Sequence, residues 1–318
     1  MVSGGTVAER RPFPNRIQPF RVERGWIRGR MVRLGSCYQE ILSRQAYPRP
    51  VATMLGETLV LAASLASALK YEGNFKLQAQ GDGPVSMLVA DLTSEGGLRG
   101  YARFDEDAFD GDELVDQKLA ADGSDLVPRL LGGGYLAFTV EQGPEGGNYQ
   151  GITPLEGAGL AECAHKYFRQ SEQLETAIKL AAMPNSGDLP ARASALMIQR
   201  MPGDRPPEMP DEEAEEAWRE AVILMSSMTS AEMLDADIPT QDILYRMYHE
   251  QGIRVFDPRP LEFKCTCSRQ KVVQTLARFG ASEFDDMKTD EGLVVVTCEI
   301  CQTDYTFDDQ EIASLPVP

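Results

Sequence analysis

Histidine is scarce in this chain, which has only His165 and His249 among 318 residues. A catalytic zinc centre keeps one coordination position open and usually draws on histidine or carboxylate ligands. Neither histidine lies at ligand spacing from a pair of cysteines. The sequence therefore gives no indication of a catalytic zinc site.

Long apolar runs are also missing. The best candidate, from Leu59 to Leu69, is short, contains serines and lies between Glu57 and Lys70, whereas a membrane-spanning helix needs about 20 apolar residues. The charges at 9–11 are not followed by an apolar segment, so we expect no secretory signal. We expect a cytoplasmic protein without a membrane partner, in which paired cysteines are metal ligands or redox thiols rather than a disulfide framework.

Positive charge is in short supply. The chain has 31 Lys and Arg residues against 49 Asp and Glu residues, for a net charge of -18 at pH 7. Because a nucleic-acid-binding surface needs a concentrated basic patch, we expect no nucleic-acid partner. The glycines at 132–134 lack the preceding strand, following helix and lysine of a phosphate-binding loop, so we expect no nucleotide site there.

The patterns that are present predict an α+β protein of four segments. Residues 1–15, rich in Gly, Pro and Arg, predict a disordered arm. Residues 16–202 combine helical spacing with strands of alternating apolar and polar residues, and predict an N-terminal α/β core with antiparallel hairpins. The expected elements are helices over 36–47, 53–70 and 155–170, strands over 28–34 and 193–201, and hairpins about the turns 94–97 and 143–147.

Residues 203–258 predict an acidic helical linker. A proline-rich break at 203–210 precedes a helical pattern over 211–249, and the segment has 14 acidic and 4 basic residues, a net charge of -10. Apolar residues recur at three- and four-residue spacing, which predicts a face that packs on the core in the resting state. We call four of them the linker stripe: Trp218, Val222, Met225 and Met228.

Residues 259–318 hold four of the six cysteines in two close pairs. Cys265 and Cys267 flank one residue, Cys298 and Cys301 flank two, and thirty residues (268–297) separate the pairs. Four thiolates can hold zinc at tetrahedral corners, so this segment predicts a small zinc domain. From the residues alone three interpretations stay open: a structural zinc site, a zinc site that is also a thiol switch, and a metal-free dithiol oxidoreductase.

The remaining two cysteines stand alone. Cys163 falls on the apolar side of the helix predicted over 155–170, and Cys37 lies near the start of the helix predicted over 36–47. We expect both to be buried and unreactive.

Several stretches resemble a known family, the redox-regulated holdase chaperones of bacteria, or thirty-three-kilodalton heat-shock proteins. The order of a Cys-x-Cys pair followed by a Cys-x-x-Cys pair is specific to it. The matching stretches are Gln80-Gly-Asp-Gly-Pro-Val-Ser86, Gly97-Leu-Arg-Gly100, Ser171-Glu-Gln-Leu174, Leu244-Tyr-Arg-Met-Tyr-His-Glu250 and Phe263-Lys-Cys-Thr-Cys-Ser-Arg269.

The resemblance implies that the four paired cysteines bind zinc when reduced. It implies that oxidation joins Cys265 to Cys267 and Cys298 to Cys301, releases the zinc and switches on binding of unfolded client proteins. It also implies a chaperone rather than an enzyme, and a homodimer on activation. Gln302 departs from the family, whose members often have glycine after the second pair; a positive φ there would strain it.

We therefore predict an ATP-independent holdase of the stress response that is activated by oxidation, with the linker stripe as its gate. Two other functions compete. The first is a zinc-ribbon adaptor that binds nucleic acid or another protein. Residues 259–318 have 6 basic and 11 acidic residues, a net charge of -5, which disfavours nucleic acid as its partner. A dithiol oxidoreductase is disfavoured because the cysteine pairs lack the strand and helix context of a thioredoxin-like site.

Overall fold

The chain divides into two compact units, residues 1–263 and 264–318. The computed structural model describes residues 11–109, 125–142, 147–200, 208–279, 284 and 287–315. The predicted disordered arm falls mostly outside these residues. Its last part is packed: Phe13 is buried against the Arg33 guanidinium, 4.1 Å from its ring centre, and Asn15 Oδ1 accepts hydrogen bonds from the backbone N–H groups of Gly35 and Cys37.

The first unit contains two six-stranded sheets, both largely antiparallel. Sheet A has the order β10-β1-β2-β9-β8, with β11 also paired to β1. Its strands are β1 (Arg16–Val22), β2 (Ile27–Leu34), β8 (Glu175–Met183), β9 (Arg192–Arg200), β10 (Ile253–Val255) and β11 (Arg259–Pro260). The strands predicted over 28–34 and 193–201 are thus confirmed as β2 and β9.

Sheet B has the order β12-β5-β4-β3-β6-β7. Its strands are β3 (Gly73–Gly81), β4 (Val85–Thr93), β5 (Gly97–Phe104), β6 (Gly134–Gln142), β7 (Asn148–Pro154) and β12 (Glu262–Phe263). Both predicted hairpins are confirmed, since β4 pairs with β5 and β6 pairs with β7. The short strand β12 joins the free edge of β5 in parallel orientation.

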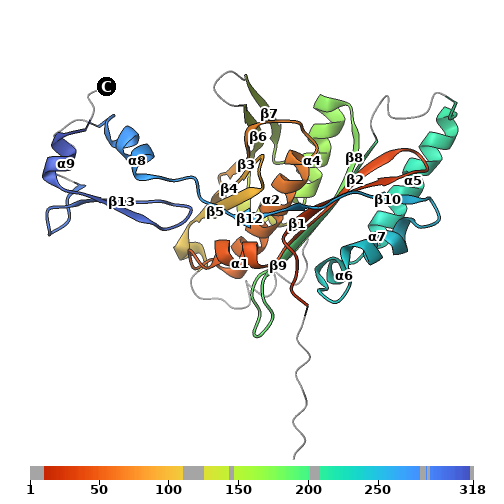
Figure 1. Cartoon of the computed structure of the whole chain (residues 1–318), viewed down its shortest axis with the longest axis horizontal. Coiled ribbons are helices and arrows are strands. Elements are labelled where there is room, and N and C mark those ends of the chain that lie inside the picture. Colours follow the sequence, from red (N-terminus) through yellow and green to blue (C-terminus); the bar gives the residue numbers. More distant parts are fainter. Residues whose placement is uncertain are drawn as a thin grey trace, which may run out of the picture. The chain divides into compact units, whose positions relative to one another are not determined.

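Helix α2 (Arg49–Ala66) lies between the two sheets and is buried on nearly every side (Figure 1). It begins four residues before the predicted helix because Pro50, in the first turn, needs no N–H partner there. The shorter helices are α1 (Ser36–Leu42) and α4 (Leu160–Tyr167), with single helical turns η1 (Glu106–Phe109), η2 (Val127–Leu131) and η3 (Phe168–Glu172). Among the described residues, no helix is long and apolar enough to cross a membrane.

Three helices cover the face of sheet A that is turned away from α2 (Figure 1). They are α5 (Asp211–Ser227), α6 (Ser230–Leu234) and α7 (Thr240–Tyr248). Helix α6 begins with a capping box in which Thr229 and Glu232 bond each other's backbone N–H groups. After α7, Gly252 turns the chain with φ +72° and β10 joins the edge of β1. The helical linker thus packs on the core, as expected of its apolar face.

The second unit is small. It contains α8 (Arg269–Leu276), the antiparallel pair β13 (Val294–Thr297) and β14 (Asp304–Phe307), and α9 (Asp309–Ala313). Its buried apolar cluster consists of only four residues among those described: Leu276, Phe284, Val294 and Phe307.

The division between the units falls after Phe263, and the sequence predicts a boundary at 258/259. Residues 259–263 belong to the first unit because β11 pairs with β1 and β12 pairs with β5. The boundary at 202/203 lies outside the described residues and stays a prediction.

Candidate metal and redox centre

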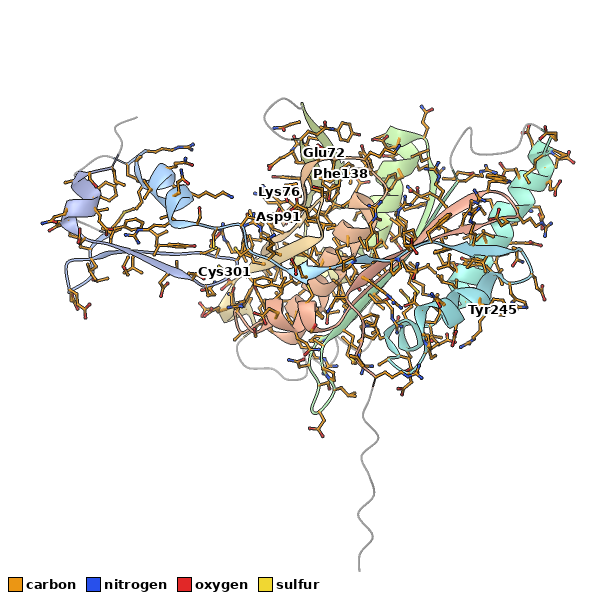
Figure 2. The ribbon with its side chains drawn as sticks, in the orientation of Figure 1. Glu72, Lys76, Asp91, Phe138, Tyr245 and Cys301 are labelled. Carbon is orange, nitrogen blue, oxygen red and sulfur yellow. The ribbon has the colours of Figure 1, made fainter. Side chains whose placement is uncertain are left out.

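The four paired cysteines come from two short loops of the second unit. Cys265 and Cys267 precede α8, and Cys298 and Cys301 lie in the turn between β13 and β14. This turn is held by two backbone hydrogen bonds: Cys298 N–H donates to Thr303 O over 3.0 Å, and Gln302 N–H donates to Cys298 O over 2.9 Å. Figure 2 labels Cys301 at this turn.

The four sulfur atoms lie within 4.8 Å of one another. Cys265 Sγ is 3.9 Å from Cys298 Sγ, and Cys267 Sγ is 3.3 Å from Cys301 Sγ. Four sulfurs bound tetrahedrally to zinc at about 2.3 Å are about 3.8 Å apart. The cluster therefore has the donor type, the number and nearly the size of a structural zinc site.

Two neighbouring hydroxyls face the sulfurs. Tyr305 donates its O–H to Cys267 Sγ over 3.1 Å, and Thr303 Oγ1 lies 3.2 Å from Cys301 Sγ. Such contacts fix the orientation of ligand side chains and stabilise negative charge on sulfur. Both residues belong to the β14 side of the turn, so the hairpin supplies two ligands together with their supporting groups.

Without a metal, thiols this close do not ionise alike. Burial raises the pKa of Cys267 to about 12 and also raises that of Cys298, with further contributions from neighbouring sulfurs. Burial opposes ionisation of Cys301 as well, but hydrogen bonds involving Thr303 and Cys267 outweigh it and lower its pKa to about 6. The thiolate at Cys301 is both the form that binds metal and the form that reacts with oxidants.

Gln302 follows the second cysteine pair with φ +55°. The positive φ on which the expected strain depends is confirmed, and a side chain in the left-handed region costs of order 1 kcal/mol. The turn that presents both Cys298 and Cys301 thus stores backbone strain. Its side-chain Nε2 donates to Glu299 O over 3.1 Å, which offsets part of that cost.

Cys37 and Cys163 lie away from this centre, in the core of the first unit. Burial raises the pKa of the Cys37 thiol to about 12 and that of Cys163 to about 11. Both thiols are buried, as predicted, and their raised pKa values disfavour the reactive thiolate.

The linker stripe faces sheet A. Met225 and Met228 are buried, and Trp218 and Val222 are partly buried against a cluster that includes Phe20 and Met31 of the sheet. The linker stripe predicted from the sequence does not include Ala217, which is buried on α5 against Gly25 of the β1–β2 turn. An alanine in a run of charged residues gives little apolar signal, although its small size is what permits this contact.

Two arginines of sheet A bind the backbone of the linker. Arg33 Nη1 donates to Ile238 O over 2.8 Å and its Nη2 donates to Asp235 O, while Arg192 Nη1 donates to Leu234 O over 2.9 Å. We call Arg33 and Arg192 the arginine clamp. It satisfies carbonyl groups at the end of α6 and in the segment between α6 and α7, where helical partners are lacking. Sequence periodicity cannot reveal it, because the partners are backbone atoms about 200 and 40 residues away.

Ion pairs border the docked linker. Arg24 Nη1 is 2.8 Å from Glu220 Oε2, and Arg200 Nη2 is 2.7 Å from Glu215 Oε1. Lys179 Nζ also donates to Ser226 O over 3.0 Å. The strongly acidic linker thus lies on a surface that supplies basic side chains, which reduces the self-repulsion of its negative charge.

Comparison with known proteins gives the class to which this arrangement belongs. The family model described as "Hsp33 protein" matches residues 15–308. A 33 kDa chaperonin of Caulobacter vibrioides is 39% identical over 294 residues, which cover 92% of this chain and 94% of that protein. A 33 kDa chaperonin of Ectopseudomonas mendocina is 38% identical over 290 residues, covering 91% and 90%.

The fold is similar to a solved structure as well. The crystal structure of the 33 kDa chaperonin of Thermotoga maritima covers 95% of this chain and 97% of its own, with a TM-score of 0.77 and 23% identity. The α+β fold and the gathering of the four cysteines are thereby confirmed.

The chain belongs to the Hsp33 family of chaperones. The resemblance stated from its motifs is confirmed. Family membership favours a chaperone over the zinc-ribbon adaptor and the dithiol oxidoreductase, and confirms the prediction of a chaperone rather than an enzyme.

Proposed function

We propose that this protein is an ATP-independent holdase that binds unfolded proteins after oxidation of its four-cysteine cluster. The observation that carries the proposal is the cluster itself, set in a unit whose described apolar core has four buried residues. A module of about 55 residues with so small a core depends on a metal or cross-link to fold.

The metal that suits this cluster is zinc. Cys265, Cys267, Cys298 and Cys301 would hold it, and its chemistry there is structural, because four protein ligands leave no open coordination position. Tyr305 and Thr303 orient two of the ligands. A structural zinc ion contributes on the order of 10 kcal/mol at neutral pH, so its loss removes the main stabilising interaction of the unit.

The pairing of the disulfides decides whether oxidation unfolds the unit. The closest sulfur pairs join the two loops, Cys265 to Cys298 and Cys267 to Cys301. Disulfides between these partners would close loops of about 35 residues and stabilise the zinc-bound shape by about 3–4 kcal/mol. Disulfides within each pair would leave the two loops unconnected. We propose the pairing that the family resemblance implies, Cys265 with Cys267 and Cys298 with Cys301, because it leaves the unit free to unfold.

Each disulfide forms from two thiols that lose two protons and two electrons to an oxidant such as a peroxide. The thiolate that is oxidised first attacks the peroxide and becomes a sulfenic acid; its pair partner then attacks that sulfur and displaces water to form the S–S bond. Zinc cannot stay bound, because the four thiolates that hold it are consumed. Reduction by a dithiol reverses both steps and restores the ligands.

The linker is the element we propose to open after the zinc is lost. Its helices depend on packing, because helices of this length are marginal in water, and the linker stripe and arginine clamp supply that packing. Opening exposes Met225, Met228 and the apolar face of sheet A. Methionine-rich surfaces adapt to many partners, which suits unfolded clients.

A holdase that is activated by oxidation also implies a cellular location, partners and an oligomeric state. We infer a cytoplasmic location, where thiols are kept reduced until oxidative stress. Unfolded proteins are the partners, and a homodimer forms on activation because two opened surfaces can cover one another. Size-exclusion chromatography of the reduced and oxidised forms tests the homodimer.

One experiment tests the proposed function. Zinc content and suppression of client aggregation are measured on the same reduced and oxidised samples of the full chain, without nucleotide. We expect one zinc ion and little suppression when reduced, and no zinc and strong suppression when oxidised. Peptide mapping of the oxidised sample identifies the disulfides; links between 265 and 298 would contradict the proposed pairing.

A further inference from the structure

A cavity of about 320 Å³ lies in the first unit, apart from the cysteine centre and the linker stripe. Its lining comes from β2, the end of α2, β3, β6, β7, α4, η3 and β9. This size is at the lower end of the range for small-molecule sites. The lining residues that carry the argument are Arg28, Arg30, Phe138, Tyr149, Phe168 and Glu172.

Aromatic rings form one wall of the cavity. Phe138 and Tyr167 meet edge to face with ring centres 4.3 Å apart, and Tyr167 meets Phe168 in the same way at 5.6 Å. Figure 2 labels Phe138 beside α4. Phe75 and Leu65 extend the apolar lining, whereas Tyr149 and Leu69 are its exposed apolar members and mark the mouth. The wall thus suits an apolar body of acyl or aryl type.

The opposite wall carries positive charge. Arg28 and Arg30 alternate along β2 and project from the same face of sheet A as Val32, toward α2. Arg30 Nη1 lies 3.5 Å from Gln199 Oε1, a neutral acceptor. Within the described part of the chain, no carboxylate forms an ion pair with Arg30. Burial, together with the like charges of Arg28 and Arg259, lowers the pKa of Arg30 to about 10.

The one carboxylate that lines the cavity has other partners. Glu172 accepts hydrogen bonds from the hydroxyls of Tyr149 and Tyr167, the latter over 2.5 Å, and the two hydroxyls lie 2.7 Å apart. Gln199 is also engaged, because its Nε2 donates to Thr176 Oγ1 over 3.1 Å. These bonds fix the polar part of the lining, and among the described residues none of the carboxylates compensates the charge of Arg30.

We propose that this cavity binds a small amphipathic carboxylate, with its apolar body against Phe138 and Phe168 and its head at Arg30. A partly buried guanidinium with no carboxylate among its described partners is destabilised by desolvation, and an anionic ligand would supply the missing charge. The aromatic wall accounts for the preference for an apolar tail. The site is independent of the cysteine centre, so the proposal stands apart from the holdase function.

Decanoate, used below its micelle concentration, is the probe, and decanol is its neutral counterpart. Calorimetric titration into the reduced, metal-loaded full chain should show saturable binding of one decanoate and at least about tenfold weaker binding of decanol, because decanol lacks a charge-assisted bond. Equal binding of the two compounds, or no saturable binding of decanoate, would overturn the proposal.

Variants locate the site. Arg30→Gln should weaken decanoate binding at least about tenfold, and Arg30→Lys should retain more of it. Ala68→Phe, which fills the cavity from the turn after α2, should block decanoate without removing any charge. Arg49→Gln is the matched control: Arg49 is exposed at the opposite end of α2. Decanoate affinity unchanged in folded Arg30→Gln and Ala68→Phe would place binding elsewhere and contradict the assignment.

Discussion

Gly25, in the turn between β1 and β2, lies directly against Ala217 of α5: a Cβ on Gly25 would be 2.8 Å from the Cβ of Ala217. The glycine has φ +82°, a conformation that other residues adopt only with strain. Two small side chains thus let the linker helix approach the sheet closely. This contact makes the docking of α5 sensitive to a single added methyl group.

Gly25→Ala should therefore loosen α5 in the reduced protein. Overpacking and backbone strain together cost about 1–3 kcal/mol, which we expect to raise hydrogen exchange over 211–227 and to give partial holdase activity without oxidation. Gly187→Ala is the control, because Gly187 also has a positive φ but no heavy atom lies near its added Cβ. Equal activation by both variants would show that backbone strain in general, not the α5 contact, is responsible.

A charge on the linker stripe should open the linker more fully. Met225→Glu or Val222→Asp places a carboxylate against the apolar face of sheet A, at a cost of about 2–5 kcal/mol. We expect holdase activity in the reduced, zinc-loaded variants. Ile223→Asp is the control on the same helix, since Ile223 is 61% exposed. Loss of helicity in Met225→Glu without activity before oxidation would show that the linker is not the gate.

Loss of the arginine clamp should also release the linker in the reduced protein. Arg33→Met removes charge-assisted hydrogen bonds to Asp235 O and Ile238 O, each worth about 1.5–3 kcal/mol. Reduced Arg33→Met should exchange faster over 230–248 and suppress client aggregation. Arg24→Met removes only an exposed pair with Glu220, worth about 0–1 kcal/mol, and should behave as wild type. The reverse order of effects would contradict the role given to the clamp.

Relieving the strain at Gln302 should make activation harder, whereas the substitutions above should make it easier. Gln302→Gly should stabilise the second unit by about 1 kcal/mol, because glycine adopts φ +55° at little cost. Chelator-induced zinc release should then be slower, and more oxidant should be needed for activation. Gln302→Ala keeps the Cβ and loses the bond to Glu299 O, so it should gain nothing. Equal stability of the two variants would argue that the backbone there is unstrained.

The four paired cysteines and the two single cysteines should differ in their effect on zinc binding. Cys298→Ser should abolish stoichiometric zinc binding, whereas Cys163→Ser and Cys37→Ser should leave it intact, because both are buried in the core of the first unit. Zinc content by atomic absorption, with a thermal melt to confirm folding, measures this. Zinc loss in Cys163→Ser as complete as in Cys298→Ser would refute the assignment.

Much of the fold follows from patterns local in sequence. The hairpins of β4–β5 and β6–β7, for example, are marked by glycine-rich turns. The cysteine cluster is also visible in the sequence, because its ligands come as close pairs. These features depend on neighbours along the chain.

The features that escaped prediction depend on distant partners. Strands β10, β11 and β12 have two or three residues each and form only because β1 and β5 offer free edges. Arg33 looks like an ordinary strand residue, yet it is buried and binds carbonyl groups about 200 residues away. The cavity at Arg30 likewise joins β2 to rings from β6 and η3. Contacts between residues so far apart leave no periodic pattern in the local sequence.

The central claim is that loss of zinc frees the linker, and that the freed linker switches on client binding. Hydrogen exchange over 211–248, followed with client-aggregation suppression in one oxidant titration, tests it most directly. The account predicts that protection of α5 and α7 falls as zinc is released and that activity rises over the same range of oxidant. Full activity while the amides of α5 and α7 remain as protected as in the reduced protein would contradict it.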